Sequence, residues 1–131
     1  MLHIENIHHV SLSITDLEKS KHFYGQILGF QELDRPNFDF PGAWYQVGSQ
    51  QLHLIQHKDS KTLRKSNELN SRDGHFAIRV KDYDQTLAYL KEKNLEVSEK
   101  PKSKSGFAQI FCNDPDFNLI EFNVDQKTLK K

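Results

Sequence analysis

The chain carries one sequence pattern twice. Residues 7–16 recur as residues 73–82, and His9 in the first copy corresponds to His75 in the second, 66 positions later. A repeat of this kind indicates one supersecondary unit used twice, with each copy supplying equivalent side chains. The duplication therefore restricts the fold to two similar modules, and it can place two histidines symmetrically around one centre.

Each copy has the same predicted order of elements. In the first, an alternating strand over residues 8–14 precedes a helix that runs to about residue 28, and three strand-like segments occupy residues 30–56. The second copy repeats this order over residues 75–124. Capping pairs are predicted at the two helix starts, Thr15 with Glu18 and Asp82 with Gln85. Residues that tolerate a left-handed conformation are predicted at the two helix ends, Gly29 and Asn94. The pattern predicts an α+β fold of two tandem βαβββ modules.

Polar residues join the two copies. We predict a single domain over residues 1–131, with module one at about residues 4–57, a linker at about 58–73 and module two at about 74–125. The lysine-containing segment 98–106 is predicted to be a mobile loop at a site mouth.

The bulk composition excludes several classes of function. The 131 residues include 18 basic and 18 acidic side chains, so nothing predicts a nucleic-acid partner. No apolar run approaches the roughly 18 residues of a membrane span. Cys112 is the only cysteine and the first residues do not resemble a signal peptide, so we expect a cytoplasmic protein that acts on small molecules.

Strand parity selects four polar side chains as candidate metal ligands. Successive side chains of a strand point to opposite faces, so a ligand must be out of phase with the apolar residues that pack under the helix. Four residues at matching repeat positions meet this condition: His9, His53, His75 and Glu121. Each histidine taken alone would more often be a hydrogen-bonded strand residue, but four at equivalent positions favour a metal site. Three imidazoles and one carboxylate suit zinc, nickel, cobalt, iron or manganese better than magnesium or calcium.

Longer motifs give the chain a family resemblance. Segments 23–30, 51–54, 74–77 and 114–121 together resemble the vicinal oxygen chelate superfamily of glyoxalases, bleomycin-resistance proteins and dioxygenases, over nearly the whole chain. The resemblance implies an eight-stranded, cup-shaped mixed sheet with helices outside, one divalent ion held by the four residues above, and a homodimer. Phe117 departs from the family pattern, which has glycine at this turn position.

Within the superfamily, residues 35–45 resemble glyoxalase I-like proteins related to lactoylglutathione lyase. This implies a metal-dependent lyase or isomerase that acts on a small hemithioacetal or a related α-hydroxycarbonyl compound, with a thiol such as glutathione as co-substrate. The glyoxalase I enzymes have glutamate where His53 stands. Glu121 would then be the only ligand carboxylate able to act as general base.

Other functions of the same fold stay open. One alternative is a metal-dependent thiol transferase or a dioxygenase, which would use three ligands. The other is a bleomycin-resistance-like binding protein without a catalytic metal.

Five further residues are candidates for substrate binding. Three aromatic side chains could form an apolar wall, although a core or interface role is equally compatible with the sequence: Phe38, Phe40 and Trp44. Arg79 shares a strand face with His75 and Arg35 follows a predicted strand, so either could bind an anionic group or form a surface salt bridge.

Overall fold

The computed structural model describes residues 1–129. The chain divides into two compact units, Met1–Leu63 and Arg64–Lys131. The boundary between them falls inside the segment predicted to be the linker.

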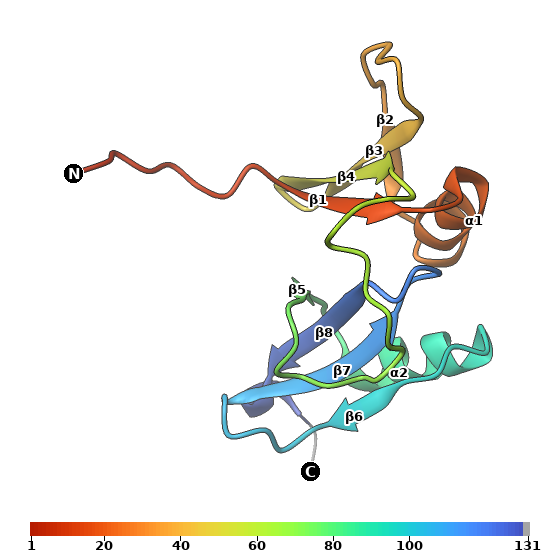
Figure 1. Ribbon diagram of the computed structural model, residues 1–131. Coiled ribbons are helices and arrows are strands. Elements are labelled where there is room, and N and C mark those ends of the chain that lie inside the picture. Colours follow the sequence, from red (N-terminus) through yellow and green to blue (C-terminus); the bar gives the residue numbers. More distant parts are fainter. Residues whose placement is uncertain (130–131) are drawn as a thin grey trace. The chain divides into compact units, whose positions relative to one another are not determined.

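The first unit is a four-stranded mixed sheet with one helical segment (Figure 1). Strand β1 runs parallel to β4, whereas the pairs β4–β3 and β3–β2 are antiparallel, which gives the order β1-β4-β3-β2. Its elements are β1 (His9–Ile14), α1 (Leu17–Lys21), η1 (His22–Ile27), β2 (Gln31–Leu33), β3 (Gly42–Val47) and β4 (Gln50–Gln56).

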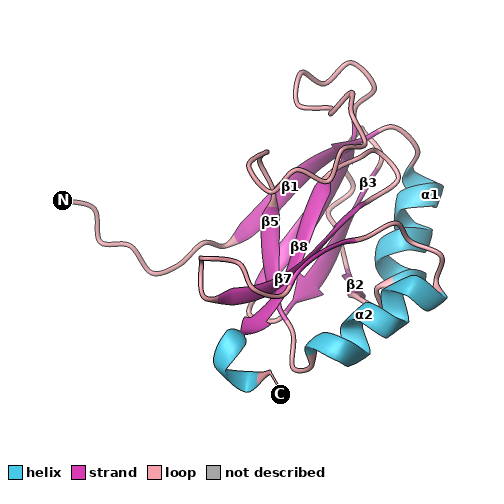
Figure 2. Cartoon of the chain, turned by 90° about the horizontal axis from the view of Figure 1, so that it is seen from below, coloured by secondary structure: helices cyan, strands magenta, loops and turns pink. Residues whose placement is uncertain are grey.

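The second unit repeats this arrangement with the order β5-β8-β7-β6 (Figure 1). Figure 2 shows its helix α2 and strands β5, β7 and β8 from below. Its elements are β5 (Phe76–Arg79), α2 (Tyr83–Glu92), β6 (Ser98–Lys100), β7 (Phe107–Asn113), β8 (Leu119–Asp125) and the short 3-10 helix η2 (Gln126–Thr128). The α+β fold of two βαβββ modules is confirmed. The strands form two separate four-stranded sheets, and these are not closed into one.

The apolar residues of the central strands form the core of each unit. In the first unit Ile14, Leu52 and Leu54 are at most 1% exposed, as the strand parity predicts. Helix α1 contacts β4 and β3, and α2 contacts β8. The fully buried or nearly buried side chains of the second unit include Leu90, Ile110, Ile120, Phe122 and Val124. Burying these side chains stabilises each unit by roughly 1.5–3 kcal/mol per large residue.

The two helix starts differ in how well the sequence predicted them. Asp82 accepts a hydrogen bond from the Gln85 backbone amide at 2.9 Å, so this cap is confirmed. In the first module the cap is Asp16, which accepts from the Lys19 amide at 3.2 Å, and the predicted Thr15 cap is wrong by one residue. A carboxylate is as good a cap as a hydroxyl, and the sequence pattern alone did not separate the two neighbours.

The first helix was predicted as one regular segment, but half of it is a π-helix. Residues His22–Ile27 form wider turns, closed by the Leu28 amide donating to the Phe23 carbonyl at 2.9 Å. Consecutive Phe23 and Tyr24 are both buried, at 3% and 0% exposure. The segment ends as predicted at Gly29, whose φ of 75° favours glycine.

The strand expected at residues 95–99 lies further along the chain. Strand β6 begins at Ser98, and all three of its residues lie within the predicted loop of residues 98–106. Pairing with β7 sets this position, because Ser98 lies opposite Phe111 and Lys100 opposite Gln109.

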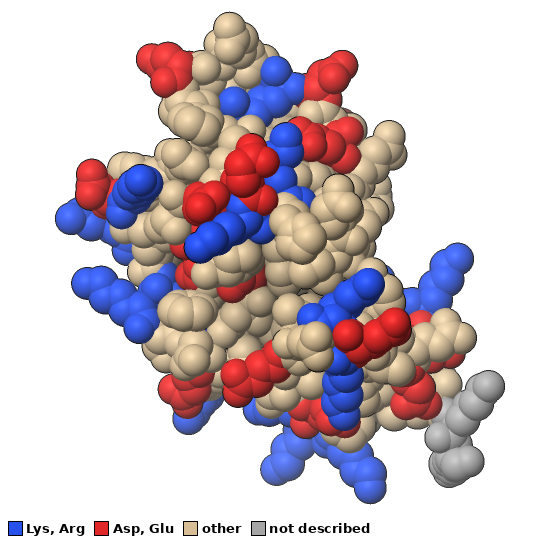
Figure 3. All heavy atoms as spheres, turned by 90° about the vertical axis from the view of Figure 1, so that its right-hand side faces the viewer, with Lys and Arg blue, Asp and Glu red and all other residues tan. Residues whose placement is uncertain are grey.

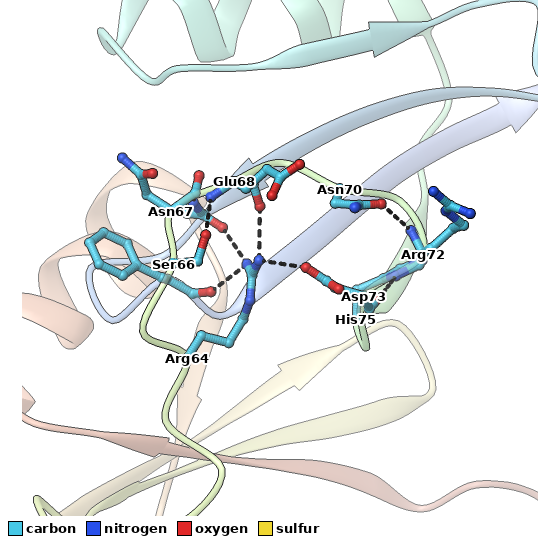
Figure 4. A network of polar contacts seen from close by, with 10 residues as sticks. Arg64, Ser66, Asn67, Glu68, Asn70, Arg72, Asp73 and His75 are labelled. Atoms are coloured by element: carbon cyan, nitrogen blue, oxygen red, sulfur yellow. Dashed lines mark hydrogen bonds and ion pairs between the residues drawn. The ribbon is translucent and has the colours of Figure 1, made fainter.

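The segment that leads into the second module is held by one arginine (Figure 4). Arg64 donates to the backbone carbonyls of Glu68 and Phe117 at 2.8 and 2.9 Å. It also contacts the Asp73 carboxylate at 3.0 Å and the Asn113 side-chain oxygen at 3.2 Å. A polar segment without regular secondary structure is therefore ordered by a guanidinium group and not by an apolar core.

The surface carries both signs of charge. Acidic and basic side chains are interspersed over the face seen in Figure 3, in keeping with the balanced composition. Among residues 1–129, no helix combines the length and apolar character needed to cross a bilayer.

Candidate functional site

The two predicted ligands of the first module lie against each other. His9 starts β1 and His53 is in the middle of β4, and their rings stack with centroids 4.0 Å apart and 15° between planes. Trp44 lies opposite His53 in the β3–β4 pair and stacks on it at 4.2 Å and 7°. His53 is therefore enclosed between an imidazole and an indole.

His53 is held in its neutral form. The side chain is 7% exposed, and its Nε2 lies 2.9 Å from the Gln51 Oε1. Its pKa is lowered from 6.5 to about 4, first by burial and further by the nearby His9 and His8. A histidine must be neutral to bind a metal ion, because the ligating nitrogen donates its lone pair.

The two predicted ligands of the second module also meet. His75 immediately precedes β5 and Glu121 lies within β8, and the distance between His75 Nε2 and Glu121 Oε1 is 3.1 Å. Glu121 is 4% exposed, so its carboxylate is almost entirely removed from water. Such a buried carboxylate requires partners that offset the cost of desolvation.

Hydrogen bonding assigns the tautomer of His75. Its Nδ1 lies 2.8 Å from the backbone oxygen of Asp73, and a carbonyl oxygen can only accept, so Nδ1 carries a proton. In a neutral ring the Nε2 lone pair then faces a carboxylate oxygen of Glu121. Two lone pairs repel at this distance unless a proton or a cation lies between them. A backbone carbonyl that orients the far nitrogen of a histidine is also typical of metal ligands.

These observations are compatible with a divalent ion. Burial lowers the pKa of His53, and Nε2 of His75 lies 3.1 Å from Oε1 of Glu121, a contact that a shared proton or a shared cation can bridge. Within residues 1–129 the structure groups the predicted ligands in pairs, one pair in each unit, and no set of three or more His, Cys, Asp or Glu side chains forms a possible metal site. The assignment of all four to one ion stays a prediction.

Asn123 was missed by the sequence reasoning. Its Nδ2 donates to the second carboxylate oxygen of Glu121 at 2.6 Å, and its Oδ1 accepts from Arg79 Nε at 2.7 Å. Strand parity could have indicated it, because Asn123 is two residues beyond Glu121 and shares its face. The arginine predicted as an anion ligand thus makes its hydrogen bond within the protein.

The other predicted substrate residues gather in the first unit. Arg35 donates to the Phe40 carbonyl at 3.0 Å, and its guanidinium lies over the rings of Phe38 and Phe40, 4.7 and 5.1 Å from their centroids. The Phe38 ring is 6.2 Å from that of Trp44. Glycine at position 42 is required here, because a Cβ would collide with the Leu54 carbonyl oxygen and lie 2.8 Å from Arg35 Nη2. The result is an aromatic row that runs from the 35–40 loop to His53.

The fold and these side chains define a class of protein. The chain contains two βαβββ modules, and each carries a pair of potential metal ligands on the face away from its helix. Duplication of one unit produces such an arrangement. The Glyoxalase/Bleomycin resistance protein/Dioxygenase superfamily model matches residues 6–122, and the chain belongs to this superfamily. The family resemblance seen in the sequence is confirmed.

Curated relatives are similar over most of the chain. "Glyoxylase I 4" of Arabidopsis thaliana is 28% identical over 123 residues, covering 92% of this chain and 71% of the relative. A "probable lactoylglutathione lyase" of Synechocystis is 30% identical, covering 86% and 90%. The metallothiol transferase FosB of Staphylococcus epidermidis is 26% identical, covering 94% and 84%.

A solved structure has the same fold. The glyoxalase family protein from Bacillus anthracis superposes with a TM-score of 0.78 at 23% identity, covering 94% of this chain and 97% of that one.

Proposed function

We propose that this protein is a metal-dependent lyase of the glyoxalase I type. Its substrate is a small hemithioacetal, formed from an α-oxoaldehyde and a thiol such as glutathione, or a related α-hydroxycarbonyl compound. His9, His53, His75 and Glu121 are proposed to bind one divalent ion. Support comes from the superfamily membership and from relatives named glyoxylase I and lactoylglutathione lyase.

One observation carries the metal-dependent part of the proposal. Nε2 of His75 and Oε1 of Glu121 lie 3.1 Å apart, and Nδ1 of His75 already donates to the Asp73 carbonyl. This arrangement is stable when a positive centre lies between the two atoms. A divalent ion supplies such a centre, and in the bound state it would stabilise negative charge that develops on a substrate oxygen.

Glu121 is proposed to move the proton. A lyase of this type moves a proton from the carbon that bears sulfur to the neighbouring carbonyl carbon, while the hydroxyl proton passes to the former carbonyl oxygen. The carbon-to-carbon step needs a base close to both carbons. Burial lowers the pKa of His53 to about 4, and the ring is enclosed by two others, so His53 is a weak base for this proton. Glu121 would therefore take the proton from one carbon and return it to the other.

The direct test is turnover of methylglyoxal with glutathione, and with other thiols, by protein loaded with zinc, nickel, cobalt or manganese. We expect the thioester product with the wild type and no product with Glu121→Gln. His57→Ala is the matched control, since His57 lies just beyond β4, and it should remain active. No product with any metal and thiol would refute the glyoxalase assignment.

Thiol transfer is the second candidate, favoured by the similarity to a metallothiol transferase. Thiol transferases of this fold use three metal ligands. If this protein is one of them, His53→Ala should retain activity with an epoxide substrate and a thiol. Oxygen uptake on a catechol would instead indicate a dioxygenase. Dialysed protein that contains no metal and still binds a drug-like ligand would indicate a bleomycin-resistance-like binding protein.

We further propose that the protein is a homodimer in the cytoplasm. The resemblance to the superfamily supports the dimer. The buried single Cys112, which has no second cysteine to pair with, is compatible with a reducing compartment.

A further inference from the structure

The carboxylate of Glu121 is fixed by a hydrogen-bonded relay within the second unit. Asn123 Nδ2 donates to Glu121 Oε2 at 2.6 Å, and Arg79 Nε donates to Asn123 Oδ1 at 2.7 Å. Glu121 and Asn123 are 4% and 6% exposed, so water cannot readily replace the bond between them, whereas Arg79 itself is exposed. Arg79 lies beside Asn123 in the β5–β8 pair, so the sheet register aligns the relay.

Arginine determines the direction of this relay. A guanidinium has donors only, so the amide oxygen of Asn123 must face Arg79 and the amide NH₂ must face Glu121. An amide without such a partner can rotate and present its oxygen to the carboxylate, which would be repulsive. Arg79 therefore selects the one amide orientation that binds Glu121.

The relay leaves the two carboxylate oxygens with different roles. Oε2 is occupied by Asn123, whereas Oε1 faces His75 Nε2. A buried carboxylate held in this way presents one oxygen to a ligand and cannot turn to present both. Hydrogen bonds to a ligating carboxylate orient it and tune its affinity for metal ions.

The first module has the same fold but lacks this relay, so the fold alone does not require it. At the positions that correspond to Arg79 and Asn123, the first module has Ser13 and Ile55. The Ser13 hydroxyl donates to the Ser60 hydroxyl at 2.7 Å, and the side chain of Ile55 cannot form a hydrogen bond. The same strands thus pair without a relay in the module whose ligand is His53, and the relay accompanies the carboxylate.

We propose that Arg79 and Asn123 are positioning residues that fix Glu121 as a one-oxygen metal ligand, and that Arg79 acts through Asn123 instead of binding a substrate anion. The metal-dependent part of this inference rests on the proposed function. The hydrogen-bonded part does not.

The first experiment measures cobalt(II) affinity by competition with a chelator, together with the visible absorption of the bound ion. Arg79→Met and Asn123→Ala should weaken binding by about 10- to 100-fold and alter the absorption bands. Arg79→Lys should recover part of the loss, because an ammonium can donate to the same amide oxygen. Gln109→Ala is the matched control, since Gln109 faces Asn123 across the β7–β8 pair, and should leave affinity unchanged.

Kinetics separate the two roles of Arg79. A positioning role lowers metal affinity and kcat, whereas loss of a substrate-anion contact raises KM and leaves cobalt affinity at the wild-type value. That second result would overturn the proposal.

The second experiment needs no metal. The Asn123 side-chain amide protons are observed by NMR in the metal-free protein, where a short bond to a carboxylate should shift one of them downfield. Glu121→Gln and Arg79→Met should each remove the shift. If Arg79→Met leaves it intact, the positioning role is refuted. If the wild type binds no cobalt while the NMR result holds, the proposed function fails and the relay stands.

Discussion

At the scale of single residues, two positions adopt a left-handed backbone conformation that residues other than glycine rarely take. Asn94 has a φ of 62° and ends helix α2, where asparagine is well tolerated. Phe117 has a φ of 65° in the turn between β7 and β8. Asp114 stabilises this turn by accepting from the backbone amides of Asp116 and Asn118 at 2.8 Å. The turn is thus imposed on Phe117 by its neighbours.

Replacing Phe117 by glycine should raise the free energy of unfolding by about 1 kcal/mol, since a left-handed conformation costs a residue with a side chain roughly 1–2 kcal/mol. Denaturant unfolding measures the change. Asn94→Gly is the matched control and should change stability by only a few tenths of a kcal/mol. Equal effects of the two substitutions would contradict the argument.

Cys112 provides a second prediction at this scale. The thiol is fully buried, and burial, with a further contribution from Asp114, raises its pKa to about 12. The reactive thiolate is therefore almost absent at neutral pH. A thiol reagent should label native protein only as fast as β7 opens, and labelling should accelerate with added denaturant. Immediate labelling of the native protein would show that the thiol is accessible.

At the scale of elements, strands carry three of the four predicted ligands, and polar contacts hold the segment that carries the fourth. His75 lies outside β5, in a segment that is anchored by Arg64 through Asp73 (Figure 4). The Asp73 carbonyl in turn orients the His75 ring. The orientation of the predicted ligand His75 therefore depends on how well residues 64–75 are held in place.

Removing this anchor should loosen the segment without unfolding the sheet. Arg64→Met should increase hydrogen exchange across residues 64–75, with little change in β7 and β8, at a cost of about 2 kcal/mol in local opening free energy. Hydrogen exchange with mass spectrometry measures both regions. Arg72→Met is the control, because Arg72 engages Asn70 through its backbone amide alone. Uniformly faster exchange over the second unit would indicate global destabilisation instead.

At the scale of the whole molecule, the proposed site draws two ligands from each module. In a symmetric dimer the two pairs can come from one chain or from both, and these cases give different results when variants are mixed. His9→Ala lacks a ligand of the first module, and His75→Ala lacks one of the second. Each variant alone should bind little metal.

If each site takes its pairs from different chains, one mixed dimer contains one intact site. Unfolding and refolding the two variants together should then restore up to about a quarter of the wild-type metal content, by random assortment in a two-fold dimer. We expect this restoration, measured by elemental analysis after gel filtration. The mixture of His9→Ala with His53→Ala is the control and should restore nothing. No recovery in the first mixture would place all four ligands in one chain.

Much of the fold could be predicted because it is local. Alternation along a strand, a cap one turn before a helix and a glycine after it depend on residues close in sequence, and the duplication doubled each of these signals. Where neighbours compete, as at Thr15 and Asp16, or where a helix widens into π turns, as around Phe23 and Tyr24, the local pattern was insufficient.

The sequence by itself determined the two modules, the face on which His9, His53, His75 and Glu121 lie, and the family. Only the tertiary structure decided how each pair is held. It placed Trp44 on His53, directed His75 Nε2 at Glu121, and joined Arg79 to that carboxylate through Asn123. The reason is physical: strand parity is a property of one strand, whereas these contacts depend on the register between strands that are far apart in the chain.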